Sequence, residues 1–174
     1  MKTAAIAVLL VILACVAGFF AFGRERTWEA LYGPADLGPV SDFADLKRPG
    51  TPNTFLVCLP EICVREEPDI VSPVFAASPH ELRAALDAIV MGSGRVEHVA
   101  KDEDGLGDRY IERTPVMRFP DTIVIRYVPV DVRRTALVIY SRSQVGSNDF
   151  GVNEKRVRNW LRLLEQVASP VAAA

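Results

Sequence analysis

A dense polar run, YSRSQVGSNDFGVN, occupies residues 140–153 and holds the residue types best suited to gripping a ligand. An arginine fork binds carboxylate or phosphate through paired hydrogen bonds, and the free amides at a helix N-terminus attract anions. Strand alternation places Arg142 on the face opposite Ser141 and Ser143. Two interpretations follow. Either Arg142 and Asp149 form an ion pair that locks the loop, or the loop presents Arg142 and the helix amides to an anion.

The other polar and glycine residues of this region complete the candidate site. Gly146 and Gly151 give the backbone the freedom for a sharp loop, and Asn153 is expected to cap the helix that follows. Asp121, at the start of the neighbouring strand, completes either arrangement. The candidate ligand or structural-lock residues are therefore Arg142, Ser143, Gly146, Asp149, Gly151, Asn153, Arg156 and Asp121.

Two cysteines, Cys58 and Cys63 in LVCLPEICV, form a second chemical feature. Four intervening residues with a proline fit a tight loop closed by a disulfide, which persists only in an oxidising compartment. Two buried thiols are the alternative, and the sequence leaves both open. No metal site is expected, because His80 and His98 stand far off without ligand-like spacing.

The chain contains no recognisable catalytic set. Gly92-Ser93-Gly94 lacks the context of a nucleophile elbow, and no glycine-rich phosphate loop with a lysine occurs. The acidic segment of residues 102–108 lacks the ligand series of a calcium loop and is expected to be a solvated hairpin turn. Neither a catalytic residue nor a cofactor is therefore predicted, and an enzyme that uses Asp121, Asp149 and Arg142 is the least supported hypothesis.

The N-terminus is unlike the rest of the chain. Residues 4–22 are 19 consecutive residues without a charge, and a helix of that length nearly crosses a hydrocarbon core of about 30 Å. The apolar run is longer than the core of a signal peptide, which favours an uncleaved anchor over residues 1–23. A cleaved signal peptide and lipidation at Cys15 are the competing interpretations.

The rest of the chain divides into a spacer and one domain. Glycine and proline pairs punctuate residues 24–53, which predicts a Pro/Gly-rich linker with at most a short helical turn near residues 28–32. Residues 54–168 are expected to form the domain, and residues 169–174 a disordered tail. Within the domain, Ser78, Pro79 and Glu81 predict a capped helix over 79–91, and an apolar stripe predicts a helix over 154–167.

Strands are expected at residues 54–58, 95–100, 109–113, 122–130 and 136–143, with the last two central because they are apolar on both faces. The order β-α-β-β-β-β-α predicts an α+β, two-layer sandwich. In it, both helices pack on one face of an antiparallel sheet, as in TATA-binding-protein-like or helix-grip architectures. A sheet of that kind can enclose an apolar cavity beside the C-terminal helix.

Charge is distributed unevenly along the chain. Residues 109–174 carry eleven basic residues, ten of them arginine, against six acidic residues, whereas the whole chain has a net charge of −2. Most of these arginines are expected to pair with the acidic first half of the chain. Nucleic-acid binding is not predicted, because it needs an overall positive field.

The final motif resembles a known family. The run YSRSQVGSNDFGVNEKRV, together with residues 118–123 and Pro52-Asn53-Thr54, is similar to the bacterial and plastid domain-of-unknown-function family numbered fourteen ninety-nine. The shared pattern is a Ser-Arg-Ser-x-x-Gly-x-x-Asp-x-Gly-x-Asn ending, and the similarity covers about residues 50–167. The resemblance implies a domain held behind a signal or anchor, and it implies no activity, cofactor or catalytic residue.

These observations favour a single-pass protein of the bacterial inner membrane, anchored by residues 4–22, with its domain in the periplasm. The leading hypothesis is non-catalytic binding of an envelope protein or of a small ligand. That ligand is either lipid-like, held between sheet and C-terminal helix, or anionic, held at the loop of residues 146–153. A structural or assembly module of the envelope is the second hypothesis.

Overall fold

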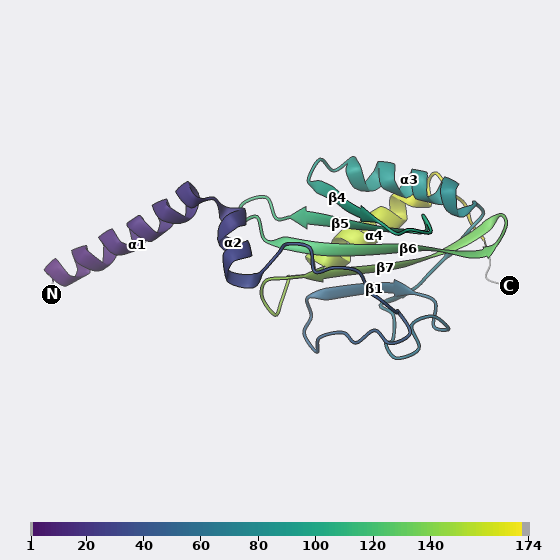
Figure 1. The fold of residues 1–174 in the computed structure, drawn as a ribbon, viewed down its shortest axis with the longest axis horizontal. Helices are drawn as coiled ribbons and strands as arrows, with labels where there is room; N and C mark the ends of the chain where they lie inside the picture. Colours follow the sequence, from purple (N-terminus) through teal and green to yellow (C-terminus); the bar gives the residue numbers. More distant parts are fainter. Residues whose placement is uncertain (1, 172–174) are drawn as a thin grey trace.

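The computed structural model describes residues 2–171, in which four helices and eight strands are found (Figure 1). The helices are α1 (Lys2–Phe22), α2 (Arg24–Tyr32), α3 (Pro79–Met91) and α4 (Val152–Leu164). The strands are β1 (Thr54–Cys58), β2 (Ile70–Val71), β3 (Val74–Phe75), β4 (Val96–Lys101), β5 (Gly107–Arg113), β6 (Pro120–Asp131), β7 (Arg134–Ser143) and β8 (Pro170–Val171). The predicted α+β class and its order of long elements are confirmed.

The sheet places β6 and β7 at its centre. Its strand order is β2-β1-β7-β6-β5-β4, with β3 beside β7 and β8 beside β3. β6 and β7 pair antiparallel from Asp121 opposite Ser143 to Asp131 opposite Arg134. β1 and β2 run parallel, so the sheet is mixed where an antiparallel sheet was expected. The two-residue strands β2, β3 and β8 are additional, because segments so short carry no alternation that a sequence can show.

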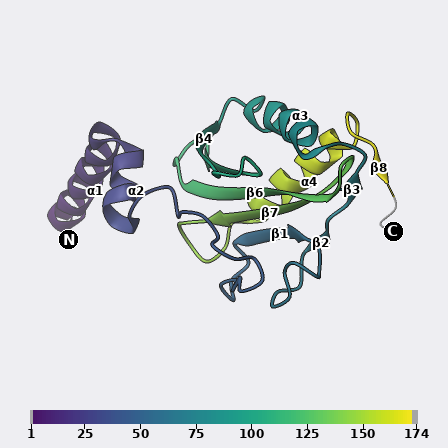
Figure 2. The same ribbon diagram turned by 45° about the vertical axis from the view of Figure 1, so that its right-hand side comes forward.

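Both α3 and α4 cover one face of the sheet (Figure 2). α3 starts at a capping box in which Ser78 and Glu81 exchange hydrogen bonds. The predicted bounds of this helix match the observed ones. α4 ends at Leu164, before the predicted end, and leaves Val167 exposed. The main core fills the space between the helices and the sheet, where an apolar ligand cavity was considered. Its members include Leu82, Leu86, Tyr110, Ile123, Ile125, Tyr127, Leu137, Trp160 and Leu164.

Residues 33–53, which we call the strap, differ from the expected free spacer. The strap runs across the outer face of the sheet, opposite the helices, and buries Ala35 and Leu46 (Figure 1). Thr122 Oγ1 of β6 donates to Ala35 O at 3.0 Å and accepts from Leu37 N at 3.1 Å. Prolines and glycines do prevent a helix or strand here. Backbone groups of the extended strap instead form hydrogen bonds with polar side chains of the sheet. A local sequence pattern cannot reveal these distant partners.

A second, smaller core lies under the strap. Leu46 packs with Leu56, Cys58, Val138 and Tyr140, and with further side chains from the strap and the loop that follows β1.

The tail also differs from the expectation. Of residues 169–174, Pro170–Val171 form β8, which pairs with β3, and residues 172–174 lie outside the described part of the chain. The sheet is thus covered on both faces.

α1 is long and apolar enough to cross a membrane, with a mean hydropathy of 2.9 and no buried residue. A signal sequence near an N-terminus can also be long and apolar enough to meet this criterion. α2 follows directly after Gly23 and packs on the loop between β5 and β6, where Trp28 Nε1 donates to Met117 O at 2.6 Å. The helical turn expected near residues 28–32 is the end of this longer helix.

Candidate functional site

Arg156 lies at the centre of a buried polar network where α4 packs on β5, β6 and β7. Its Nε donates to Glu112 Oε2 and its Nη2 to Asp121 Oδ2, each at 2.6 Å. Its Nη1 donates to Ser141 Oγ at 2.9 Å and to Asn153 Oδ1 at 2.6 Å. Arg156 is 9% exposed and Asp121 is 3% exposed. A guanidinium is tolerated at such a position only with paired charges and hydrogen-bond acceptors, and this network supplies two carboxylates and an acceptor for each nitrogen.

Asn153 joins this network to the start of β1. Its Nδ2 donates to Asn53 O at 3.1 Å and to Ser143 Oγ at 3.0 Å. Asn53 Nδ2 in turn donates to Gly146 O at 2.8 Å. Asn153 was expected to be the helix cap, but it is the second residue of α4 and is buried. Its amide therefore connects the helix, the loop and β1.

Asp149 takes over the capping role. Its carboxylate accepts from Gly151 N at 2.9 Å and from Asn153 N at 2.7 Å, at the positive end of the α4 dipole. Gly151 has φ 74°, a conformation that favours glycine. Phe150 N donates to Asn148 Oδ1, so a third amide of the loop is also occupied. The anion at this helix terminus is the protein's own carboxylate, which removes the donors that an external anion would need.

Arg142 does not pair with Asp149, so the expected ion-pair lock is wrong. Its Nη2 donates to two strap carbonyls, Leu37 O at 3.1 Å and Gly38 O at 2.8 Å. Its guanidinium carbon lies 5.6 Å from the centroid of the Tyr140 ring on the same outer face. Burial lowers the pKa of Arg142, although a guanidinium keeps its proton at neutral pH. Arg142 therefore fastens the strap, while Arg156 locks the helix.

The three residues of the enzyme hypothesis do not meet in one site. Asp121 belongs to the Arg156 network, Asp149 caps α4, and Arg142 faces the strap on the other side of the sheet. Burial raises the pKa of Asp121 above its usual value, and the charge of Arg156 opposes that effect. These three residues therefore belong to a structural connection and an outer strap contact, and they do not converge on one another.

Cys58 and Cys63 lie at disulfide distance, with their Sγ atoms 2.02 Å apart. Both are buried in the smaller core. The loop that they enclose places Ile62 against that core and Glu61 at its edge. The pair thereby fixes one wall of a surface depression on the outer face of the sheet.

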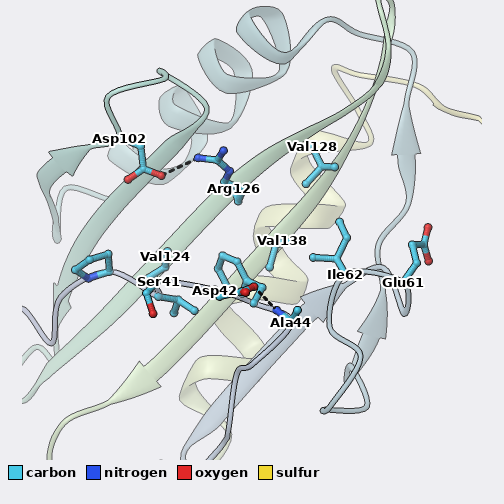
Figure 3. Close-up of a pocket in the computed structure, with 13 residues that line it drawn as sticks. Ser41, Asp42, Ala44, Glu61, Ile62, Asp102, Val124, Arg126, Val128 and Val138 are labelled. Atoms are coloured by element: carbon cyan, nitrogen blue, oxygen red, sulfur yellow. Dashed lines mark hydrogen bonds and ion pairs between the residues drawn. The ribbon is translucent and has the colours of Figure 1, made fainter.

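A half-open depression of about 610 Å³, which we call the outer hollow, lies between the strap, the cysteine loop and β6–β7 (Figure 3). Val124, Val128 and Val138 form its apolar floor. Carboxylates at its edge belong to Asp42, Glu61 and Asp102, and the one basic lining residue is Arg126. Arg126 Nη1 donates to Asp102 Oδ2 at 3.0 Å, which neutralises one carboxylate. The hollow is apolar at its base and acidic at its rim.

Sequence reasoning missed the strap wall of this hollow and one buried ion pair. Asp108, placed in a solvated turn by the sequence, is 2% exposed and lies in β5. Its Oδ2 accepts from Arg83 Nε at 2.6 Å and its Oδ1 from Arg83 Nη2 at 2.7 Å, and His98 Nε2 also lies 2.7 Å from Oδ1. The strand starts two residues before the predicted one. Strand alternation puts Asp108 on the same face as the apolar Tyr110, and this was the sequence signal that Asp108 is buried.

The fold and the site define a class of protein: an α+β domain behind an apolar N-terminal helix, in which the polar signature connects the last helix to the sheet. The chain belongs to the family described as protein of unknown function (DUF1499), whose model matches residues 46–164. The family predicted from the final motif is therefore confirmed.

Other comparisons add little. No curated protein matches the chain. The crystal structure of PFC0360w, an HSP90 activator from Plasmodium falciparum, is similar with a TM-score of 0.46 at 13% identity. The alignment covers 68% of this chain and 99% of that one. This similarity is too low to transfer any role to the present chain.

Proposed function

We propose that this protein is a membrane-anchored domain of the bacterial envelope that binds a small amphiphilic ligand in the outer hollow, without catalysis. The hollow is the observation that carries the proposal, since its volume falls within the roughly 300–1,000 Å³ of small-molecule sites. A floor of three valines suits an apolar body. The ligand's polar end lies at the rim.

The acidic rim selects the charge of that polar end. Asp42 and Glu61 form no ion pair within residues 2–171, whereas Arg126 is held by Asp102 and Asp104. A neutral or cationic head group is therefore favoured over an anionic one. This replaces both ligand positions considered from the sequence, because the space beside α4 is filled and the loop amides are occupied.

The proposed location is the periplasmic side of the inner membrane, with α1 as an uncleaved single-pass anchor. The length and apolar composition of α1 support the anchor. The cysteine pair supports an oxidising compartment, because a disulfide persists there. A cleaved leader would deliver the same domain to the same compartment. The molecular mass of the protein in the membrane fraction distinguishes the uncleaved anchor from the cleaved leader.

Native mass spectrometry of the protein extracted from its own membrane tests the ligand. We expect a bound small molecule that is lost in Val128→Trp, because the indole fills the floor of the hollow. Val130→Trp is the matched control, since Val130 lies on the same strand, is exposed and does not line the hollow. A ligand-free wild type, or a Val128→Trp variant that keeps the ligand, would contradict the proposal.

A second candidate is an assembly module in which the hollow receives an apolar side chain from an envelope protein. The half-open shape of the hollow favours this alternative, because a partner can cover the open side. Photo-crosslinking from Val128 in native membranes distinguishes the two: a protein adduct supports the module, and a small-molecule adduct supports the ligand.

A further inference from the structure

Two loops lie beside α2 at the end of the sheet from which α1 leaves (Figures 1 and 2). One is the β5–β6 loop, residues 114–119, and the other is the β7–α4 loop, residues 144–151. Trp28 Nε1 binds Met117 O in the first loop, and Gln144 Nε2 of the second donates to Pro34 O at 2.6 Å. We call α2 and these two loops the anchor end. Its hydrogen bonds hold the domain close to the last turn of α1.

Aromatic packing makes this connection continuous with α1. The ring of Trp28 lies between Phe19 of α1, at 5.3 Å between centroids, and Phe119 of the β5–β6 loop, at 4.7 Å. Arg24, two residues after the end of α1, donates from Nη1 to Val116 O. The distance from Val116 to the chain just after α1 is therefore no more than the length of one arginine side chain plus one hydrogen bond. A bilayer that contains α1 has its head groups at this depth.

Both loops expose an apolar side chain at the anchor end. Val116 is 67% exposed and Phe150 is 85% exposed. Arg118 and Phe150, with φ of 60° and 55°, are the non-glycine residues with positive φ among residues 2–171, and each loop contains one of them. Such backbone costs free energy, and it is retained where function needs the conformation. An exposed phenylalanine held in this way contributes little to the fold and suits an external apolar phase.

Arg24 and Arg26 give the anchor end two arginines that suit lipid phosphates, while its acidic residues equal its basic residues in number. Arg118 pairs with Glu25 at 2.8 Å, whereas Arg24 and Arg26 pair with no carboxylate within residues 2–171. Basic side chains directly after a membrane span bind lipid phosphates and are favoured at an anionic surface. An aromatic residue such as Trp28 is also typical of this depth.

We propose that the anchor end is a lipid-docking surface, in which Val116 and Phe150 enter the head-group region while Arg24 and Arg26 bind phosphates of anionic lipids. The inference rests on α1 being a membrane anchor, as proposed above, and extends it. The domain stands on the bilayer in one fixed orientation instead of moving freely on a tether. The β6–β7 hairpin, at the opposite end of the sheet, then points away from the membrane (Figure 1).

Single-cysteine fluorescence in lipid nanodiscs of phosphatidylcholine and phosphatidylglycerol tests the surface. The full-length chain, with Cys58 and Cys63 left unreduced, is labelled with an environment-sensitive dye at native Cys15, or at Val116→Cys, Phe150→Cys or Val132→Cys in a Cys15→Ala background. Val132 is the matched control, because it is 87% exposed in the β6–β7 hairpin. Nitroxide-labelled lipids with shallow and deep quenchers report the depth of each dye.

We expect blue-shifted emission at positions 116 and 150, and at least twofold stronger quenching by the shallow nitroxide than at position 132. Quenching at both positions should weaken when phosphatidylglycerol is omitted. If Cys15 is quenched by the deep nitroxide while positions 116 and 150 behave like position 132, the docking surface is refuted and the anchor stands. If the dye at Cys15 is not quenched, the anchor and the docking surface both fail.

Discussion

Replacement of Arg156 by methionine gives the most direct test of the lock. Methionine keeps much of the apolar stem and removes every donor of the guanidinium. Asp121 and Glu112 then lose their shared cation, and Asp121 stays buried as an uncompensated carboxylate. Ser141 and Asn153 also lose a donor each. The variant thus breaks one side of a buried ion pair and leaves the other side in place.

The expected cost is large for one substitution. Breaking a buried pair by removal of one partner destabilises a protein by about 3–5 kcal/mol. Domains are commonly stable by about 5–15 kcal/mol, so the variant folds but with a much reduced margin. At about 4 °C per kcal/mol for a domain of this size, the melting temperature falls by about 12–20 °C.

Urea unfolding followed by tryptophan fluorescence measures this change, because Trp160 lies in α4 within the core. Arg158→Met is the matched control. Arg158 is on the same helix, but its pair with Glu154 is exposed on both sides, and such pairs contribute less than about 1 kcal/mol. If Arg156→Met is no more destabilising than Arg158→Met, the network is not the lock that we infer.

The pH dependence of the stability difference between the wild type and Arg156→Met gives an independent check. In the wild type the charge of Arg156 opposes the effect of burial, which raises the pKa of Asp121 above the ordinary value of 3.8. Without that charge the pKa of Asp121 in the folded variant rises further. The folded variant then binds a proton at a pH where the wild type does not, so the variant gains relative stability as the pH falls. The loss of stability in Arg156→Met should therefore be largest at neutral pH and should shrink on acidification. A loss that grows on acidification would refute this account.

Further substitutions address the cap, the strap and the cysteine pair. Asp149→Ala removes the acceptor for Gly151 N and should cost about 1–2 kcal/mol in urea unfolding, with Asp149→Asn retaining part of the stability. Arg142→Met removes the donors to two strap carbonyls, so hydrogen exchange of the strap should accelerate while global stability falls by about 1–2 kcal/mol; unchanged exchange would contradict this role. Changing both Cys58 and Cys63 to serine should cost about 2 kcal/mol through the lost cross-link, and free alkylation of both thiols in unreduced protein would disprove the cross-link.

The elements that the sequence predicted well are those fixed by local chemistry. The capping box at Ser78 and Glu81 and a proline at the first turn gave the start of α3, because all three signals act within four residues. Apolar residues on both faces identified β6 and β7 as central strands. The strap was missed, since the Thr122 side chain that binds Ala35 and Leu37 lies 85 or more residues further along the chain.

The contacts that the candidate residues make were not predicted from the sequence. Arg142, Asp149 and Arg156 were all selected, yet the arginine that pairs with carboxylates is Arg156. The error came from assuming that the nearest opposite charge in sequence is the partner. Alternation along β7 already placed Arg142 on the face opposite Ser141, and therefore opposite the helix that Asp149 caps.

The position of Arg142 connects the polar signature to the proposed binding region. Most residues of the signature face α4, where their hydrogen bonds are taken up within the fold. Arg142 contacts the strap at Leu37 and Gly38, directly before the strap residues 39–44 that form a wall of the outer hollow. Its guanidinium therefore sets the position of that wall relative to β7. A change at Arg142 should reach a ligand in the hollow through the strap, whereas a change at Arg156 should act on stability first.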